Sequence, residues 1–201
     1  MTETAAGTPR STRRRPARER LLAAAARRFY ADGVAATGID TITAEAGVAK
    51  MSLYNNFSSK ADLVKAYLDA RHEEWLGLYR ARLAQAHGPR DGVLAVFDAY
   101  ADHAAFAYEH GFRGCGLLNA AAELPAGDEG RAVVRRHKEE VEGLLAGHLA
   151  DLLPERPEQA RARAEHLAFL LEGAMARAGL EGEGTRLRHA RAMAADLLDT
   201  L

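Results

Sequence analysis

The sequence predicts an all-α fold, and three observations support this prediction. Apolar residues recur at spacings of three and four along most of the 201-residue chain. No segment alternates apolar and polar residues with the β-branched enrichment that is typical of strands. Glycine and proline stand mainly between the periodic segments, where they end helices. With 48% hydrophobic and 27% charged residues, the composition is that of an ordinary globular protein.

The N-terminal quarter is predicted to hold a flexible arm and a first helix. Residues 1–15 have no apolar period and are rich in Thr, Ala, Arg and Gly, so we expect a disordered basic arm. A helix over 16–32 follows, because Leu22 and Phe29 lie on one face of it. We expect residues 16–65 to form one small domain.

Two short helices joined by a glycine are predicted next. The first runs from about Asp40 to Ala46, and the second begins at about Ala49. Gly47 supplies the backbone freedom for a tight turn between them, which makes the pair a helix-turn-helix. Four apolar residues at helical spacing are expected to face inward: Ile42, Ala46, Leu53 and Phe57.

The outward face of the second short helix carries the chemistry of a major-groove reader. Its side chains combine hydrogen-bond donors, acceptors and a small apolar group, which base edges require. These side chains are Lys50, Met51, Ser52 and Asn55. Beyond them Ser59 and Asp62 resemble a capping box that opens a long helix toward Gln85.

Residues 66–201 are predicted to form a second, larger helical domain. Its helical segments are separated by Gly and Pro clusters. They are Val93 to Gly111, Leu117–Leu124, Arg131–Leu153, Pro157–Ala178 and a last helix from a Thr185 cap to Leu201.

The net charge of −1 conceals an asymmetry. Residues 1–65 carry 11 basic and 6 acidic side chains, a net charge of +5, and the remainder carries 16 and 22, a net charge of −6. A basic front suggests that this part meets a polyanion. A GC-rich genome would explain the many arginines but not their position at one end.

Composition and motifs also exclude several classes. A single Cys excludes an internal disulfide, and the longest apolar runs are too short to span a bilayer, so we expect a cytoplasmic protein that does not insert in membranes. No phosphate loop, dinucleotide fingerprint or nucleophile motif is present, so we expect neither an enzyme nor a cofactor. The eight histidines form no HExxH and no Glu-x-x-His pair, so we expect no metal. A helical enzyme and an Arg-rich module for anionic lipid remain as alternatives. Cys115 is either an oxidant sensor or a small buried residue.

The motif over Pro16–Lys65 resembles the amino-terminal domain of TetR-family transcriptional regulators. The resemblance rests on Ala46-Gly47-Val48, Leu53-Tyr54 and the run Phe57-Ser58-Ser59-Lys60 at fixed offsets. The chain departs from the family pattern at Thr43, Asn56 and Ser58, and a buried Thr43 would need a hydrogen-bond partner, such as a carbonyl one turn back.

The resemblance implies a transcriptional regulator, expected to be a repressor, that binds double-stranded DNA. It implies phosphate contacts from Thr37, Thr41, Tyr54, Asn56 and Lys60, and base contacts from Lys50, Met51, Ser52 and Asn55. The alternative for each residue is a solvated helix face. Because one recognition helix reads only a few base pairs, we expect a dimer on a palindromic operator with half-sites one turn apart.

Helices 157–178 and 185–201 are the expected homodimer interface. The first is apolar over more than one face, which indicates a partner besides its own core. The alternative is that both helices pack within one monomer.

The second domain is expected to bind a small hydrophobic or aromatic effector that releases or modulates DNA binding. The candidate lining residues are mostly aromatic, with a few polar groups, and the alternative is that they fill the core. They are Trp75, Phe97, Tyr100, His103, Phe106, Leu117, Asn119 and Phe169.

Overall fold

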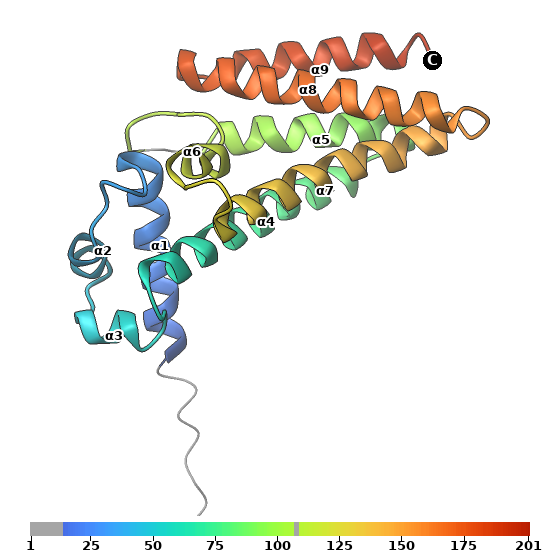
Figure 1. Ribbon diagram of the computed structural model, residues 1–201. Helices are drawn as coiled ribbons and strands as arrows, with labels where there is room; N and C mark the ends of the chain where they lie inside the picture. The colour runs from blue at the N-terminus through green and yellow to red at the C-terminus, as the bar shows by residue number, and fades with distance from the viewer. Residues whose placement is uncertain (1–13, 107–108) are drawn as a thin grey trace, which may run out of the picture. The chain divides into compact units, whose positions relative to one another are not determined.

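The computed structural model describes residues 14–106 and 109–201, and every regular element in these two ranges is an α-helix (Figure 1). The all-α prediction is therefore confirmed. The chain divides into two compact units, one ending at Tyr67 and the other beginning at Leu68. The arm predicted over 1–15 lies outside the described residues, except for its last two, which begin the first helix.

The first unit is built from three helices and the start of a fourth. These are α1 (Arg14–Asp32), α2 (Ile39–Ala46), α3 (Lys50–Tyr54) and the beginning of α4 (Lys60–Leu83). Helices α1, α2 and α3 pack against one another. Their shared core contains all four residues that were predicted to face inward. It includes Leu21, Phe29, Ile42, Ala46, Leu53, Phe57 and Leu63. Leu21 is fully buried whereas Leu22 is only half-buried, so the inward face of α1 is turned by one residue from the prediction.

Two local signals in this unit are formed as the sequence suggests. Gly47 ends α2 in the left-handed conformation, with φ 59°, and joins it to α3 by a tight turn. The Ser59 hydroxyl accepts a hydrogen bond from the Asp62 N–H at 3.1 Å, which caps α4. Asp62 in turn accepts from the Ser58 N–H at 2.9 Å, one residue earlier than in the usual box.

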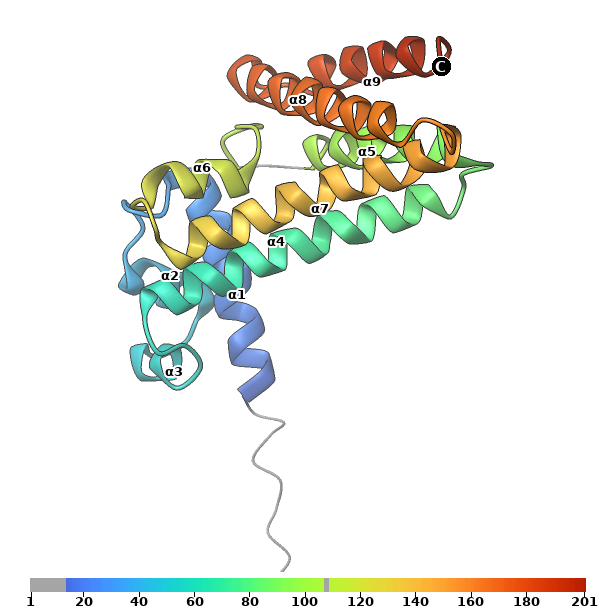
Figure 2. The same ribbon diagram turned by 45° about the vertical axis from the view of Figure 1, so that its right-hand side comes forward.

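The second unit contains the rest of α4 and five further helices. These are α5 (Pro89–Ala104), α6 (Gly116–Glu123), α7 (Glu129–Leu152), α8 (Pro157–Glu181) and α9 (Thr185–Leu198). Helix α7 packs on α5, α6 and α8, and α9 packs on α5 and α8 (Figure 2). The predicted Thr185 cap is wrong, because Gly184 precedes the helix and the Thr185 hydroxyl accepts from Arg188 instead. None of the helices described is both long and apolar enough to cross a bilayer.

A close backbone approach fixes the loop before α6 against α8. A Cβ atom on Gly179 would lie 2.7 Å from the Gly114 Cα, closer than any side chain tolerates. Two glycines at this crossing therefore let the loop and α8 touch through their backbones. Cys115, the next residue, is buried.

Candidate nucleic-acid interface

Helix α3 presents one apolar side to the core and the rest of its surface to solvent. Leu53 is fully buried and anchors the helix, and Gly47 and Ala49 set its start. Met51 is 70% exposed and Tyr54 is 48% exposed, so both side chains face solvent. The structure thus brings the predicted base readers together on one helical turn and its C-cap. Lys50, Met51 and Asn55 are exposed, and Ser52 is half-buried.

Lys50 has a partner that the sequence analysis missed. Its ammonium lies 2.9 Å from the Asp40 carboxylate, in the first turn of α2. The hydrogen bond that Lys50 donates to the Asp40 carboxylate, together with the negative charge of Asp40, raises the pKa of Lys50. Asp40 is ten residues earlier in the chain, and only the turn at Gly47 brings the two side chains together.

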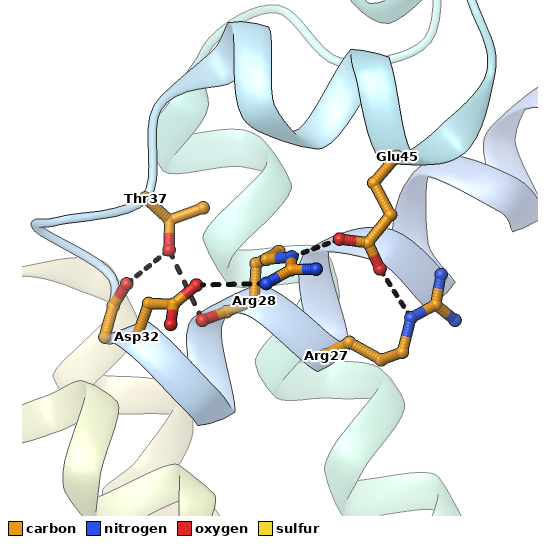
Figure 3. Close-up of polar contacts among 6 residues, drawn as sticks. Arg27, Arg28, Asp32, Thr37 and Glu45 are labelled. Atoms are coloured by element: carbon orange, nitrogen blue, oxygen red, sulfur yellow. Dashed lines mark hydrogen bonds and ion pairs between the residues drawn. The ribbon is translucent and has the colours of Figure 1, made fainter. Parts of the chain in front are cut away.

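The predicted phosphate contacts divide into exposed and buried residues. Thr41 and Tyr54 are exposed, and Lys60 is half-buried at the start of α4. The prediction for Thr37 is wrong for its side chain, which is only 2% exposed. Its hydroxyl donates to the Gly33 carbonyl at 2.6 Å and so closes the turn between α1 and α2 (Figure 3).

Two polar residues that depart from the family pattern bond to nearby backbone. The Thr43 hydroxyl donates to the Asp40 carbonyl at 3.1 Å, as a buried threonine in a helix was predicted to do. The Asn56 side chain donates to the Ser52 carbonyl at 2.7 Å. This bond uses one of the two amide protons and stabilises the end of α3, and the phosphate contact of Asn56 stays a prediction.

Helix α2 is held on α1 by a carboxylate between two arginines (Figure 3). The Arg27 Nε donates to one oxygen of Glu45 at 2.5 Å, and Arg28 donates to the other oxygen. Arg28 also pairs with Asp32 at 3.6 Å. Burial raises the pKa of Glu45, but the hydrogen bonds from Arg28 and Arg27 outweigh burial and lower it. This cluster fixes the orientation of the helix-turn-helix on its supporting helix.

Some of the basic residues near the N-terminus also serve the fold. The Arg18 guanidinium lies 5.0 Å from the centre of the Phe57 ring, a cation–π contact. The Arg20 Nη1 donates to the Gly47 carbonyl at 3.4 Å. Together with Arg27 and Arg28, these residues account for part of the basic excess by contacts within the unit, so the excess is not all available to a polyanion.

In the second unit, the candidate effector residues form an aromatic cluster and a smaller pair. Trp75 and Tyr100 are both buried, with ring centroids 5.1 Å apart. His103 contacts Phe106 at 5.4 Å, and Phe106 is 38% exposed. Phe97 and Leu117 are buried, as core residues would be.

Two of the candidates have other roles. Phe169 is 66% exposed on α8 and lines a groove between α8 and α9, so its placement with the aromatic cluster was wrong. The Asn119 amide donates to the Arg113 carbonyl at 2.9 Å and holds the loop before α6. An exposed phenylalanine on a helix with two apolar faces belongs to an outer surface and not to the core.

A chain of polar groups runs through the same cluster, and the sequence analysis missed most of it. Lys138 pairs with Glu172 at 2.7 Å and also donates to the Tyr100 hydroxyl at 3.4 Å. That hydroxyl lies 3.2 Å from His137, whose other ring nitrogen lies 2.9 Å from His72. The signal in the sequence was the place of His137 on the buried stripe between Val133 and Val141.

Burial and neighbours set the protonation of this cluster. Burial, followed by the positive charge of Lys138, lowers the pKa of His137 to about 3, so the ring is neutral at pH 7. Burial alone would lower the pKa of Lys138, but Cys115, Tyr100 and the Glu172 carboxylate raise it, so the amine stays charged. The Cys115 sulfur lies 3.7 Å from that ammonium.

The geometry of the first unit defines a helix-turn-helix DNA-binding protein, in which a short helix is anchored by Leu53 and exposes polar and apolar side chains. Comparisons with known proteins identify the family. Residues 21–67 match the family model described as bacterial regulatory proteins, tetR family. The HTH-type transcriptional regulator TtgR of Pseudomonas putida is 44% identical over 64 residues, 32% of this chain and 30% of its own length. The match therefore spans less than a third of that curated relative.

Similarity to solved structures covers nearly the whole chain. A TetR-family transcriptional regulator from Streptomyces coelicolor is 32% identical, with a TM-score of 0.77, over 92% of this chain and 94% of its own. A putative TetR transcriptional regulator from Streptomyces avermitilis is 28% identical, with a TM-score of 0.71, over 91% and 98%. The chain belongs to the TetR family. Regulators of this family bind DNA and small-molecule effectors, act as dimers and are not enzymes.

Proposed function

We propose that this regulator is a repressor that binds a palindromic operator as a homodimer and is released or modulated by an aromatic effector. The observation that carries the DNA-binding part is the exposed face of α3, with Lys50, Met51 and Asn55 outward and Leu53 buried. Lysine can donate to guanine, asparagine can bond adenine in a bidentate manner, and methionine can touch a thymine methyl group. Thr41, Tyr54, Asn56 and Lys60 then supply phosphate contacts that set the register.

The proposed dimer forms through α8 and α9. Phe169 and Met193 are exposed on these helices and line a groove of about 510 Å³ with Leu170, Gly173, Ala174, Arg177, Arg186, His189 and Ala190. A second copy of the chain is the occupant that we propose, because a symmetric pair of such helices buries both apolar faces as a four-helix bundle. Two recognition helices would then read half-sites about 34–36 Å apart.

The effector is proposed to bind among the aromatic rings of the second unit. Trp75 is 2% exposed, and its indole N–H is a buried donor with no hydrogen-bond partner in the described residues. A buried donor of this kind is stabilised when a ligand supplies an acceptor. Trp75 lies on α4, a continuous helix whose first turn carries Lys60, so a ligand that shifts α4 can act on the DNA-binding residues.

Selection of bound sequences from random duplex DNA tests the DNA-binding proposal. The full chain should enrich an inverted repeat, and its affinity should fall as salt rises, with a slope set by the number of phosphates contacted. Retention on anionic phospholipid vesicles with no enriched sequence would instead support the lipid-binding alternative and refute the proposal.

The effector proposal can be tested by intrinsic fluorescence, because Trp75 is the one tryptophan of the sequence. We expect phenol, benzoate or aniline at millimolar concentration to quench or shift the fluorescence of Trp75 and to change retention of the selected duplex. The variant Trp75→Phe should lose the fluorescence signal and weaken the effect on DNA. Quenching without any change in DNA retention would contradict a regulatory role for the site.

A further inference from the structure

We propose that Asp40 and Lys50 together read one G·C base pair, with Lys50 donating to guanine and Asp40 accepting from cytosine. This assignment rests on the proposed function, since it presumes that α3 enters the major groove. It adds to the interface a residue from α2 that belongs to neither the phosphate set nor the base set described above.

The first observation is where the Asp40 and Lys50 side chains lie. Asp40 lies in the first turn of α2 and its side chain is 80% exposed, while Lys50 is the first residue of α3 and is 55% exposed. The Lys50 ammonium and an Asp40 oxygen are 2.9 Å apart. A donor and an acceptor are therefore presented side by side at the edge of the recognition surface.

The second step is the match of this pair to a base-pair edge. In the major groove, guanine shows two acceptors, N7 and O6, and cytosine shows the N4 amino donor. O6 and N4 are hydrogen-bonded to each other within the base pair, so they are separated by about 2.9 Å. That spacing equals the separation of the Lys50 and Asp40 polar atoms, so each can meet its complement at the same time.

The flanking groups distinguish G·C from the other pairs. The ammonium of Lys50 would find the second guanine acceptor, N7, beside O6, and the Asp40 carboxylate would find only a carbon-bound hydrogen beside N4. With thymine at the Lys50 position and adenine at the Asp40 position, the ammonium faces the thymine methyl group and the carboxylate faces the adenine N7 acceptor. The reversed C·G pair places the Lys50 ammonium, a donor, against the cytosine N4 amino group, which is also a donor.

The ion pair also explains how an acid is tolerated on a surface that meets phosphates. An isolated carboxylate there would repel the DNA backbone, whereas a carboxylate paired with Lys50 presents no net charge. The contact restrains the flexible lysine stem, which would otherwise lose more conformational entropy when it binds a base.

The test compares base preferences of the wild-type chain and Asp40→Ala on duplexes selected from random DNA by the wild-type chain. We expect a G·C pair at one position of each half-site, and replacing it by T·A should weaken wild-type binding about 5- to 100-fold. In Asp40→Ala the same replacement should cost at least about threefold less than in the wild-type chain, because only the contribution of Lys50 remains. Asp40→Asn keeps an acceptor oxygen and should retain the preference for cytosine.

Glu19→Ala is the matched control, because it removes an exposed acid of the same unit that lies on α1. It should leave the preference at every position unchanged. Thermal melting followed by circular dichroism checks that each variant folds. An Asp40→Ala profile identical to wild type, or an equal loss on selected and scrambled duplexes, would overturn the inference. If the wild-type chain selects no sequence at all, the proposed function itself fails.

Discussion

Tyr54 and Lys60 differ from Asn55 in what their side chains can recognise. Tyr54 is 48% exposed at the end of α3, and Lys60 begins α4, so both can reach the sugar-phosphate backbone, which is the same for every sequence. We expect Tyr54→Phe and Lys60→Ala to weaken binding to selected and scrambled duplexes alike, by about three- to tenfold each. Lys60→Ala should also reduce the salt slope by about one per bound chain.

Fluorescence anisotropy titrations at several salt concentrations measure both quantities. Lys65→Ala provides a control that removes one positive charge from the following turn of α4. A change in base preference for Tyr54→Phe, or an unchanged salt slope for Lys60→Ala, would contradict the assignment of these residues to the phosphates.

His137 makes the stability of the protein depend on pH. Its pKa is about 3 in the folded chain and 6.5 as the reference value for an exposed histidine. Between these values the unfolded chain binds a proton that the folded chain does not, so the free energy of unfolding falls as pH drops below about 6.5. The slope contributed by one such group is at most about 1.4 kcal/mol per pH unit.

Urea unfolding at pH 7 and pH 5 checks this expectation. The variant His137→Gln should be less stable than wild type at pH 7 but should lose less of its stability on acidification. Burial also lowers the pKa of His148, which remains in the variant and keeps a residual slope. Equal pH slopes for variant and wild type would show that His137 is not the responsive group.

At the residue scale, the burial of apolar residues could be predicted from the sequence better than the contacts of polar residues. Ile42, Leu53 and Phe57 were correctly predicted to face inward, because helical spacing alone determines which apolar residues share a face. Thr37 and Asp40 could not be placed, because the partner of a hydroxyl or a carboxylate depends on the path of a turn. Helical spacing places His137 on a buried stripe, but it does not identify the partners of residues far apart in sequence, such as Tyr100 with His137 and Lys138.

At the scale of elements, the turn at Gly47 determines how α3 is presented. Gly47 has a φ of 59°, and a Cβ atom there would meet nothing closer than an Arg20 nitrogen at 3.8 Å. Gly47→Ala should therefore destabilise the protein through backbone strain and not through a clash, by about 1 kcal/mol. Asparagine adopts this conformation more readily than alanine, so Gly47→Asn should cost less.

Thermal unfolding of the two variants measures this difference. The order of stability should be wild type, then Gly47→Asn, then Gly47→Ala, and the affinity for DNA should follow the same order. Equal stability of all three proteins would mean that the turn relaxes without strain.

The boundaries of the elements were predicted less well than their existence. Helix α8 extends to Glu181, beyond the predicted end at Ala178, and α4 ends at Leu83, before the predicted Gln85. Capping signals are short and ambiguous: Ser59 caps α4 as predicted, whereas Thr185 bonds to Arg188 and leaves the N-cap position to Gly184. Helix ends depend on such single hydrogen bonds, and helix interiors depend on many residues together.

At the scale of the whole molecule, the proposed dimer places two recognition helices on one operator. This matters because a single recognition helix reads only a few base pairs. Phe169 and Met193 are exposed in the groove between α8 and α9, so changing them should leave the monomer fold intact. We expect Phe169→Glu and Met193→Glu to shift the protein toward monomer, because a charge would be buried in the dimer interface. Sedimentation equilibrium at micromolar concentration measures this shift.

Leu118→Glu on α6 is the control, since Leu118 is exposed outside the groove and should leave the dimer unchanged. The monomeric variants should also lose binding to a two-half-site duplex while keeping their helical content. A variant that remains dimeric with glutamate at Phe169 would place the interface elsewhere.

In the folded protein, several of the basic residues behind the charge asymmetry make contacts within the first unit. The net charge of +5 over residues 1–65 includes Arg18, Arg20, Arg27 and Arg28, which contact groups within the first unit. The charge available for DNA is therefore carried by fewer residues than the count suggests. Of the two lysines with a predicted role, Lys50 is paired with Asp40, and Lys60 is the one predicted to contact a phosphate.

The central claim is that α3 reads bases, and the base preferences of Asn55→Ala test it most directly. Bound sequences should be selected from random duplex DNA with the wild-type chain and with this variant, under the same salt conditions. We predict that the wild-type site is an inverted repeat and that Asn55→Ala relaxes the preference at one symmetry-related pair of positions, leaving the others unchanged. An equal loss of affinity at every position, with the consensus unaltered, would contradict base readout by this helix.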